Sequence, residues 1–375
     1  MNSPPFMSPD VVAILTTLED LEAIRPGWTA LWEQCPSATP FQSPEWLIPW
    51  ARRWANDSLH VLTVRQSGTL VGLAPFFIYE RTLLLLGNGI SDTLDLLAAP
   101  GCERVVCASV MTMLAEQSDD WNSCDWQQLR ADSPLMAHDA PADWRETIEP
   151  QDACPSLALP ENRPFETVLS PHFLSRLQAD QVRLSRVGEV RFERATPDNF
   201  NAHFDSLAEL HAARWSSRNQ PGVLAEFDVQ AFHREAASGL LARGALRFYR
   251  LLVGERVAAV YYGFHHRDHA SYYLGGFDPA LSSFGVGNQI VWHAIRGAQQ
   301  EGARCFNFLR GRERYKYRWG AVDTPAFRRR LYTLTEAPAA GGNVASRKMN
   351  GDGTHHRAEC IHCGVEGFTT GTQTQ

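Results

Sequence analysis

The segment ALRFYRLLVGERVAAVYYGFHH, residues 245–266, has the pattern of a β-hairpin. Two runs rich in aromatic and aliphatic residues flank a Gly-Glu-Arg turn, and this arrangement indicates two paired antiparallel strands. A third strand (SYYLGGF, 271–277), a helix (288–300) and a short buried strand (RCFNFL, 304–309) are expected to follow. The helix ends next to Gly302, a residue typical of helix C-termini.

An earlier part of the chain has the same order of elements. A hairpin is predicted over LHVLTVRQSGTLVGLAPFFIY (59–79), then a short strand over TLLLLG (82–87), a helix over 101–118 and a strand over CDWQQLR (124–130). The similarity lies in the order of elements and not in aligned identities. Two copies of one supersecondary unit explain such a repeat, so the predicted fold class is mixed α/β with two tandem units.

The rest of the chain sets the predicted boundaries. Helical periodicity covers residues 11–58, and a Pro-, Ala- and acid-rich stretch over 131–165 indicates a loop-dominated junction. After residue 335 the chain is rich in Gly, Ala and Thr without apolar periodicity, which is typical of disorder. The predicted domains are therefore residues 1–160, residues 161–335 and a disordered tail over 336–375.

Composition excludes several classes of protein. The 375 residues carry 35 basic and 42 acidic side chains, a net charge of −7, which argues against a protein that coats nucleic acid. The sequence contains no apolar stretch of 18 residues and no secretory signal pattern, so no membrane span is expected. Eight scattered cysteines indicate reduced thiols in the cytoplasm. No metal site is predicted, because the tail residues Cys360 and Cys363 lack a second spaced pair.

A glycine-containing turn is the first candidate binding feature. Gly285, Val286, Gly287 and Asn288 lie between a predicted strand and a predicted helix. Two glycines allow a tight turn and close approach of a ligand, and the helix N-terminus presents unpaired N–H groups that suit a pyrophosphate. A strand-to-helix turn without any ligand would have the same sequence.

The second feature is the basic, aromatic segment RGRERYKYRWG, residues 310–320. With Arg304 it contains six cationic residues near the end of a predicted strand, enough to serve an anionic ligand, and Lys316 is among them. Tyr315 and Tyr317 are candidate proton donors and Glu313 is a candidate base. The alternative is a solvated, charged helix start. Asp92, after a first-half strand, is a candidate contact for a cationic acceptor or else a capping residue.

Together these segments resemble a known family. The residues 272–279 and 285–320, with LHAARW (210–215) and PFQSPEWLIPWARRW (40–54), look like the CelD-like acetyltransferases of cellulose biosynthesis, a branch of the GNAT superfamily related to FemAB-type transferases. The resemblance covers roughly residues 35–332.

The resemblance implies two GNAT-like halves, with acyl-CoA bound only in the second half by the Gly285–Asn288 loop. It implies that a tyrosine, Tyr315 or Tyr317, protonates the departing thiolate, and that residues 272–277 form the strand beside the donor. It also suggests that His211, Arg214 and Trp215 line the substrate cleft. The chain departs from the family pattern at Ser282, where Gln or Arg is usual, and at Arg312, where Asp is frequent.

These observations favour an acyl-CoA-dependent N-acyltransferase, with acetyl-CoA as donor and a small molecule or a saccharide as acceptor. Two alternatives stay open: a FemAB-like transferase that uses aminoacyl-tRNA, and a non-catalytic accessory factor of cellulose or exopolysaccharide assembly. The acidic net charge argues mildly against tRNA. The sequence does not specify the acceptor or the oligomeric state.

Overall fold

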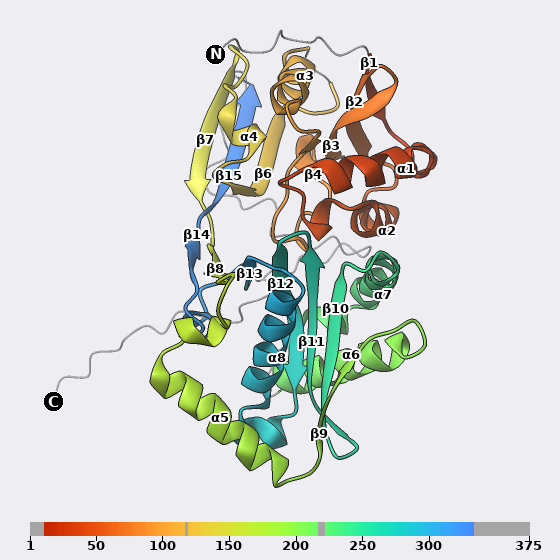
Figure 1. The fold of residues 1–375 in the computed structure, drawn as a ribbon. Helices are drawn as coiled ribbons and strands as arrows, with labels where there is room; N and C mark the ends of the chain where they lie inside the picture. Colours follow the sequence, from red (N-terminus) through yellow and green to blue (C-terminus); the bar gives the residue numbers. More distant parts are fainter. Residues whose placement is uncertain (1–10, 117–118, 217–221, 334–375) are drawn as a thin grey trace, which may run out of the picture.

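Two β-sheets with helices on their faces make up the protein (Figure 1). The computed structural model describes residues 11–116, 119–216 and 222–333, without the side chains of residues 214–216. The first sheet has the order β1-β2-β3-β4-β6-β15-β7, with β5 paired to β3. Its strands are β1 (Val11–Leu15), β2 (Leu59–Gln66), β3 (Thr69–Tyr79), β4 (Thr82–Leu85), β5 (Leu97–Ala98), β6 (Ser123–Arg130), β7 (Trp144–Pro150) and β15 (Ala326–Thr333).

The second sheet has the order β14-β8-β13-β12-β11-β10-β9. It consists of β8 (Cys154–Ala158), β9 (Val190–Arg194), β10 (Leu246–Val253), β11 (Arg256–His266), β12 (His269–Phe277), β13 (Cys305–Asn307) and β14 (Val322–Thr324). The mixed α/β class with two sheets, expected from the sequence, is confirmed.

The predicted repeat of elements is also present. Hairpin, third strand, helix and parallel strand follow one another as β2–β3–β4–α3–β6 and again as β10–β11–β12–α8–β13. In each copy the third strand pairs in parallel with the last strand over three residue pairs. The order of elements read from the two hairpins therefore predicted the topology of both units.

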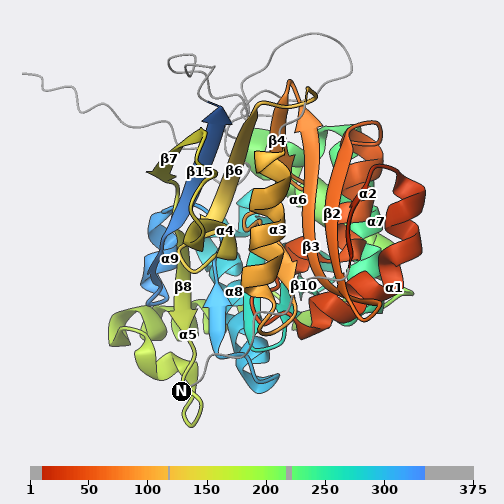
Figure 2. The same ribbon diagram turned by 90° about the horizontal axis from the view of Figure 1, so that it is seen from above.

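Helices cover both faces of each sheet. On the first sheet, α3 lies across one face, and α1 and α2 lie against the other (Figure 2). On the second sheet, α5 and α8 pack on one face, and α6 and α7 on the other. The helices are α1 (Leu18–Gln34), α2 (Pro44–Trp54), α3 (Glu103–Ala115), α4 (Pro134–Ala137), α5 (Pro171–Ser185), α6 (Phe200–Ser216), α7 (Phe227–Ala242), α8 (Val286–Gln300) and α9 (Arg314–Arg318); short 3-10 helices are η1 (Pro40–Gln42), η2 (Phe165–Val168), η3 (Val223–Ala225) and η4 (Pro279–Phe284).

The two sheets exchange strands. β15, close to the end of the described chain, pairs with β6 and β7 in the first sheet, whereas β8 pairs with β13 and β14 in the second. The sheets therefore do not follow the predicted division at residue 160, which stays a prediction of domain boundaries. The predicted tail over 336–375 lies outside the described residues.

Two local predictions were wrong. Residues 11–15, expected to be helical, form the edge strand β1, because their backbone pairs with β2. The 131–165 stretch, expected to be mostly loop, contains α4, β7 and β8. In both cases pairing with strands distant in sequence supplies the backbone hydrogen bonds, and local composition does not record such pairing.

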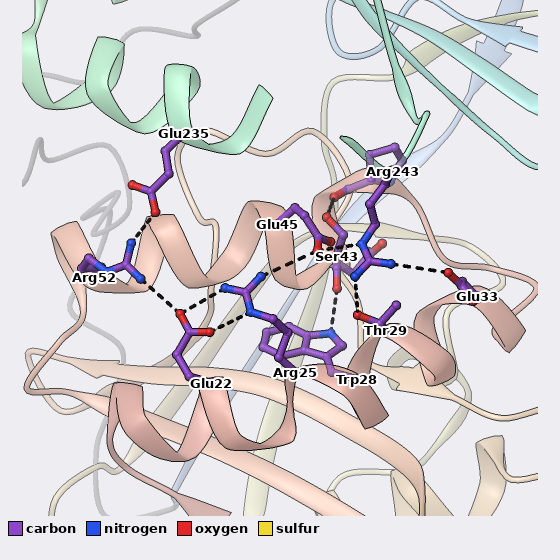
Figure 3. A network of polar contacts seen from close by, with 12 residues as sticks. Glu22, Arg25, Trp28, Thr29, Glu33, Ser43, Glu45, Arg52, Glu235 and Arg243 are labelled. Atoms are coloured by element: carbon purple, nitrogen blue, oxygen red, sulfur yellow. Dashed lines mark hydrogen bonds and ion pairs between the residues drawn. The ribbon is translucent and has the colours of Figure 1, made fainter. Parts of the chain in front are cut away.

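A shared core and an ion-pair network join the two units. Apolar side chains of α1 and α2 pack with those of α6, α7 and β10–β12 in one cluster. Beside it, the buried Glu45 of α2 pairs with Arg243 at 2.7 Å and with Arg25 at 3.6 Å, and Arg52 bridges Glu22 and Glu235 (Figure 3). The two units are therefore held together by the burial of apolar side chains as well as by ion pairs.

Candidate functional site between β12 and β13

The second sheet opens between two of its central strands. β12 and β13 pair only from His269 to Ser271 and from Cys305 to Asn307, although β12 continues to Phe277. On its other side β12 pairs with β11 to its end, with a register shift that leaves Tyr273 as an extra residue. A bulge of this kind re-aims side chains and interrupts pairing. Pairing of β12 with β13 therefore ends at Ser271, six residues before the end of β12.

A segment of the first unit reaches this opening. Asp92, whose side chain is fully buried, pairs with Arg310 at 3.1 Å, and one of its oxygens accepts a hydrogen bond from the Arg310 N–H at 3.3 Å. The hydroxyl of the bulge residue Tyr273 donates to the Ile90 carbonyl at 2.9 Å. Asp92 was predicted to meet a cationic acceptor. Its cationic partner in the structure is the guanidinium of Arg310, so the carboxylate positions the loop after β13.

Lys316 holds the same loop from the other side. Its buried ammonium donates hydrogen bonds of 2.8–3.0 Å to the carbonyls of Leu309, Arg310 and Gly311, and lies 2.9 Å from a Glu313 oxygen. This turn needs support, because Leu309 adopts a left-handed φ of 57°. Lys316 was predicted to contact the donor. In the structure its ammonium serves the loop, so its contact with a donor stays a prediction.

The predicted cationic cluster is largely neutralised. Of its six members, Arg304 pairs with Glu161, Arg310 with Asp92, Arg312 with Asp323 and Lys316 with Glu313. Arg314 and Arg318 are exposed on α9. Arg312, which stands where the family often has Asp, thus makes a surface ion pair with Asp323.

The two candidate tyrosines have different surroundings. Tyr315 is half-buried, and its ring lies 6.3 Å from that of Phe308, in the cluster against which Tyr272 of β12 also packs. Tyr317 is exposed and donates a hydrogen bond to Asp323 at 2.7 Å. Desolvation, followed by the neighbouring Asp323 carboxylate, raises the pKa of Tyr317 to about 12. Of the two tyrosines, Tyr315 is thus the one that packs in the cluster bordering β12 and β13. Glu313, the predicted base, has its charge balanced by Lys316.

The glycine loop lies on the α5/α8 side of the sheet. Gly285 is the N-cap of α8 in the left-handed conformation, with φ of 68°, and Val286 begins the helix. Gly287 lies against Phe277, because a Cβ there would be 3.4 Å from the Phe277 ring. The predicted residues Gly285, Val286, Gly287 and Asn288 thus form the first turn of α8 at the end of β12. The N-terminal backbone of a helix is suited to binding an anion through its N–H groups.

The space next to this turn already contains a carboxylate. Asp180 of α5 is buried, and a Cβ on Gly285 would lie 2.5 Å from its Oδ2 atom. Arg183 binds Asp180 at 2.5 Å and donates to the Ser283 carbonyl at 2.8 Å. The pyrophosphate of a CoA donor thus fits the loop backbone but not this occupied environment.

The predicted acceptor residues lie on the opposite face of β12. His211 of α6 is buried, and the backbone of Leu210 and His211 lies so close to Gly276 that a Cβ there would be 2.7–2.8 Å from it. The side chains of Arg214 and Trp215 lie outside the described residues. His211 therefore borders the strand of the opening from the α6 side.

Sequence reasoning missed Tyr273, Arg310 as a partner of Asp92, and Asp180. The first two belong to segments that the sequence had singled out, but a bulge and a contact between the units leave no local signal. Asp180 lies in a helix that reads as basic and solvent-exposed. Its spacing of three residues from both Leu177 and Arg183 places all three on one helix face, which was a usable but weak signal.

Other kinds of site find no support in the described parts of the chain. No group of three metal-binding side chains comes together there. Among the helices that the structure describes, none combines the length and apolarity needed to cross a membrane. The six cysteines in these parts are free thiols. The Cys/His motif at residues 355–363 lies outside them.

Comparison with known proteins gives a family match to part of the chain and a similarity of fold. A family model described as an acetyltransferase (GNAT) domain matches residues 172–317. A search of the curated proteins found no significant match. Among solved structures, FemX has a TM-score of 0.59 at 9% identity, over 83% of this chain and 96% of that chain.

Two further solved structures are similar. A conserved protein of unknown function from Bacteroides thetaiotaomicron has a TM-score of 0.54 at 14% identity, covering 86% of this chain and 100% of that one. The L-PGS from Bacillus licheniformis has a TM-score of 0.53 at 11% identity, covering 82% and 90%. At such identities the likeness concerns the fold alone, and both units take part in it.

Proposed function

We propose that this chain, a GNAT-type acyltransferase, transfers an acyl group from acyl-CoA to an amine in the opening between β12 and β13. The observation that carries the proposal is the early end of the β12–β13 pairing next to the Tyr273 bulge. A bound acyl group could contact the backbone of Leu274–Gly276 there, where N–H groups can stabilise the charge that develops on the carbonyl oxygen.

The chemistry needs few side chains. An uncharged amine attacks the thioester carbonyl directly, so the protein has to position both reactants, accept a proton from the amine and give one to the leaving thiolate. We assign the proton donation to Tyr315, because its ring packs in the cluster that borders β12 and β13. His211 borders the acceptor side of β12. The loop of Arg310 and Gly311, fixed by Asp92 and Lys316, forms the rim at the end of β13.

Finer assignments remain part of the proposal. Acetyl-CoA is the donor we expect, and a small molecule or a saccharide precursor is the acceptor. The RGRERYKYRWG segment supports the CelD-like acetyltransferases as the closer relatives within the superfamily. The free thiols of the described residues suit a reducing compartment such as the cytoplasm.

A second candidate function has a specific observation in its favour. Asp180 lies directly beside Gly285, in the loop that we expect to bind the pyrophosphate of a CoA donor. A FemAB-like transferase that takes an aminoacyl group from tRNA does not need this place, and the fold similarity to FemX is compatible with such a donor.

The test is release of free thiol from acetyl-CoA with a panel of amines and amino sugars, followed by mass spectrometry of the products. We expect Tyr315→Phe to lower kcat by about 100-fold, within the range for loss of a general acid, and Tyr317→Phe to stay within about threefold of the wild type. Equal loss in both variants would contradict the assignment. CoA binding without thiol release across the panel would favour the accessory factor. Aminoacyl transfer from tRNA without CoA binding would favour the second candidate.

A further inference from the structure

Helix α5 covers the glycine loop along one of its faces. Residues three apart contact successive parts of the loop: the Leu177 carbonyl accepts a hydrogen bond from Gln289 at 2.8 Å, Asp180 lies against Gly285, and Arg183 binds the Ser283 carbonyl at 2.8 Å. This spacing follows a single helix face, so the covering contacts form one surface. Access to the first turn of α8 is thus controlled by α5.

The middle contact places a negative charge at the helix N-terminus. The Asp180 side chain is 6% exposed and is bound by Arg183 at 2.5 Å, with Arg176 at 3.9 Å. Gly285 supplies no side-chain cap to α8, and its missing Cβ leaves the space for the Asp180 carboxylate. The N-terminal end of a helix carries a partial positive charge that favours an anion. Asp180 therefore places a carboxylate directly beside this helix N-terminus.

We propose that Asp180 is a specificity-determining residue, an internal anion that keeps the pyrophosphate of a CoA donor out of the glycine loop. The inference rests on the proposed acyl transfer from CoA in the β12–β13 opening. A pyrophosphate at this helix end would lie beside a buried carboxylate of like charge, and the guanidinium of Arg183 is already engaged by that carboxylate. A CoA donor would then be held by its acyl-pantetheine part in the opening, and its nucleotide part would contribute little affinity.

The departure of Ser282 from the family pattern agrees with this assignment. The resemblance implies Gln or Arg at this position as a phosphate contact, whereas the guanidinium that contacts the neighbouring Ser283, that of Arg183, already pairs with Asp180. Removing the Asp180 charge would free Arg183 and the α8 N-terminus together. A single substitution should thus restore a phosphate site.

The experiment compares two ligands that differ only in the phosphate-bearing part. Binding of acetyl-CoA and of S-acetyl-pantetheine is measured by calorimetry for the wild type, Asp180→Asn and Asp180→Ala. Glu255→Gln is the control for net charge, since Glu255 is 95% exposed and pairs with Arg191 away from the loop. Asp180→Asn preserves the shape of the side chain, and thermal unfolding of each variant confirms that it is folded.

We expect the wild type to bind both ligands with affinities within about threefold of each other. Asp180→Asn should bind acetyl-CoA at least about tenfold more tightly, with no change for S-acetyl-pantetheine, and Glu255→Gln should change neither. Wild-type binding that strongly prefers acetyl-CoA, or unchanged or weaker acetyl-CoA binding by folded Asp180→Asn, would overturn the inference. Tighter acetyl-CoA binding by Asp180→Asn without any thiol release would uphold it and reject the proposed catalysis instead.

Discussion

The two units of the molecule use the same succession of elements differently after the third strand. In the second unit, β12 is long, carries a bulge and separates from β13, and a glycine turn leads into α8. In the first unit, β4 is short, and the chain after it forms β5 on β3 and then passes to α3. The position that holds a candidate donor loop in one unit holds a supporting segment in the other.

That supporting segment explains why both units are needed. Residues 90–92 leave the first unit and contact Tyr273 and Arg310, two residues that border the opening in the second. Residues of the first unit thus support the opening between β12 and β13 in the second unit. The comparison predicts that changes in the first unit alter the site of the second.

The largest effect is expected from the contact between the units. Asp92→Ala leaves Arg310 without its carboxylate partner in a largely buried place, and removal of one member of a buried pair costs about 3–5 kcal/mol of unfolding free energy. Urea unfolding measures this loss. The double variant Asp92→Leu/Arg310→Met should recover much of the stability while leaving acyl transfer impaired; full recovery of activity would show that the pair only stabilises the fold.

A pH effect should arise in the same first-unit segment. Burial, only partly offset by a hydrogen bond from Ser133, raises the pKa of Asp95 from 3.8 to about 7. The folded state therefore holds a proton that the unfolded state releases near pH 4, and stability falls as pH rises from about 4 to about 7. Between pH 5 and pH 8 the unfolding free energy should fall by about 3 kcal/mol.

Urea unfolding at several pH values tests this, with Asp95→Asn as the comparison. The asparagine variant cannot release the proton, so its stability should lose this part of the pH dependence. If the unfolding free energy of the wild type and of Asp95→Asn changed equally with pH, the effect would have to come from other titratable groups.

Two closely packed glycines, one in each unit, sharpen the comparison further. Gly72 of β3 lies under Val106 of α3, and Gly276 of β12 lies under Leu210 and His211 of α6, each without room for a Cβ. Alanine at either position should destabilise the protein by about 1–3 kcal/mol, since the helix has to move away from the sheet. Only Gly276→Ala should also lower kcat/KM for acyl transfer at a temperature where both variants are folded. Equal kinetic losses would mean that the opening is not confined to the second unit.

The smallest effect is expected at the surface of the RGRERYKYRWG segment. Arg312 and Asp323 are more than one-third exposed, and such pairs contribute about 0–1 kcal/mol. Arg312→Ala should therefore leave both stability and turnover close to those of the wild type. A large loss of turnover would instead show that this position, where the family often has Asp, takes part in catalysis.

The sequence predicted those parts of the fold that depend on local pattern. The hairpins at 59–79 and 245–266, the third strands and the helix after Gly285 follow from alternation, turn residues and apolar spacing. Pairing between distant segments is not encoded in that way, so β1, β7 and the return of β15 to the first sheet were missed. At the site, the sequence identified important residues more successfully than it identified their roles. Lys316 and Asp92 were singled out for their charges, but their partners, the 309–311 carbonyls and Arg310, became known only from the fold.

Because β15 belongs to the first sheet, that sheet can be completed only after the second unit has been synthesised. β6 receives its neighbour β15 from a segment about 200 residues further along the chain. During synthesis at about 5–20 residues per second, the first sheet therefore waits about 10–40 seconds with the β6 edge unpaired. An incomplete chain that stops before Ala326 cannot close that sheet, and the exposed edge is a template for pairing with other chains. Completion of the first unit thus depends on the ribosome having finished the second.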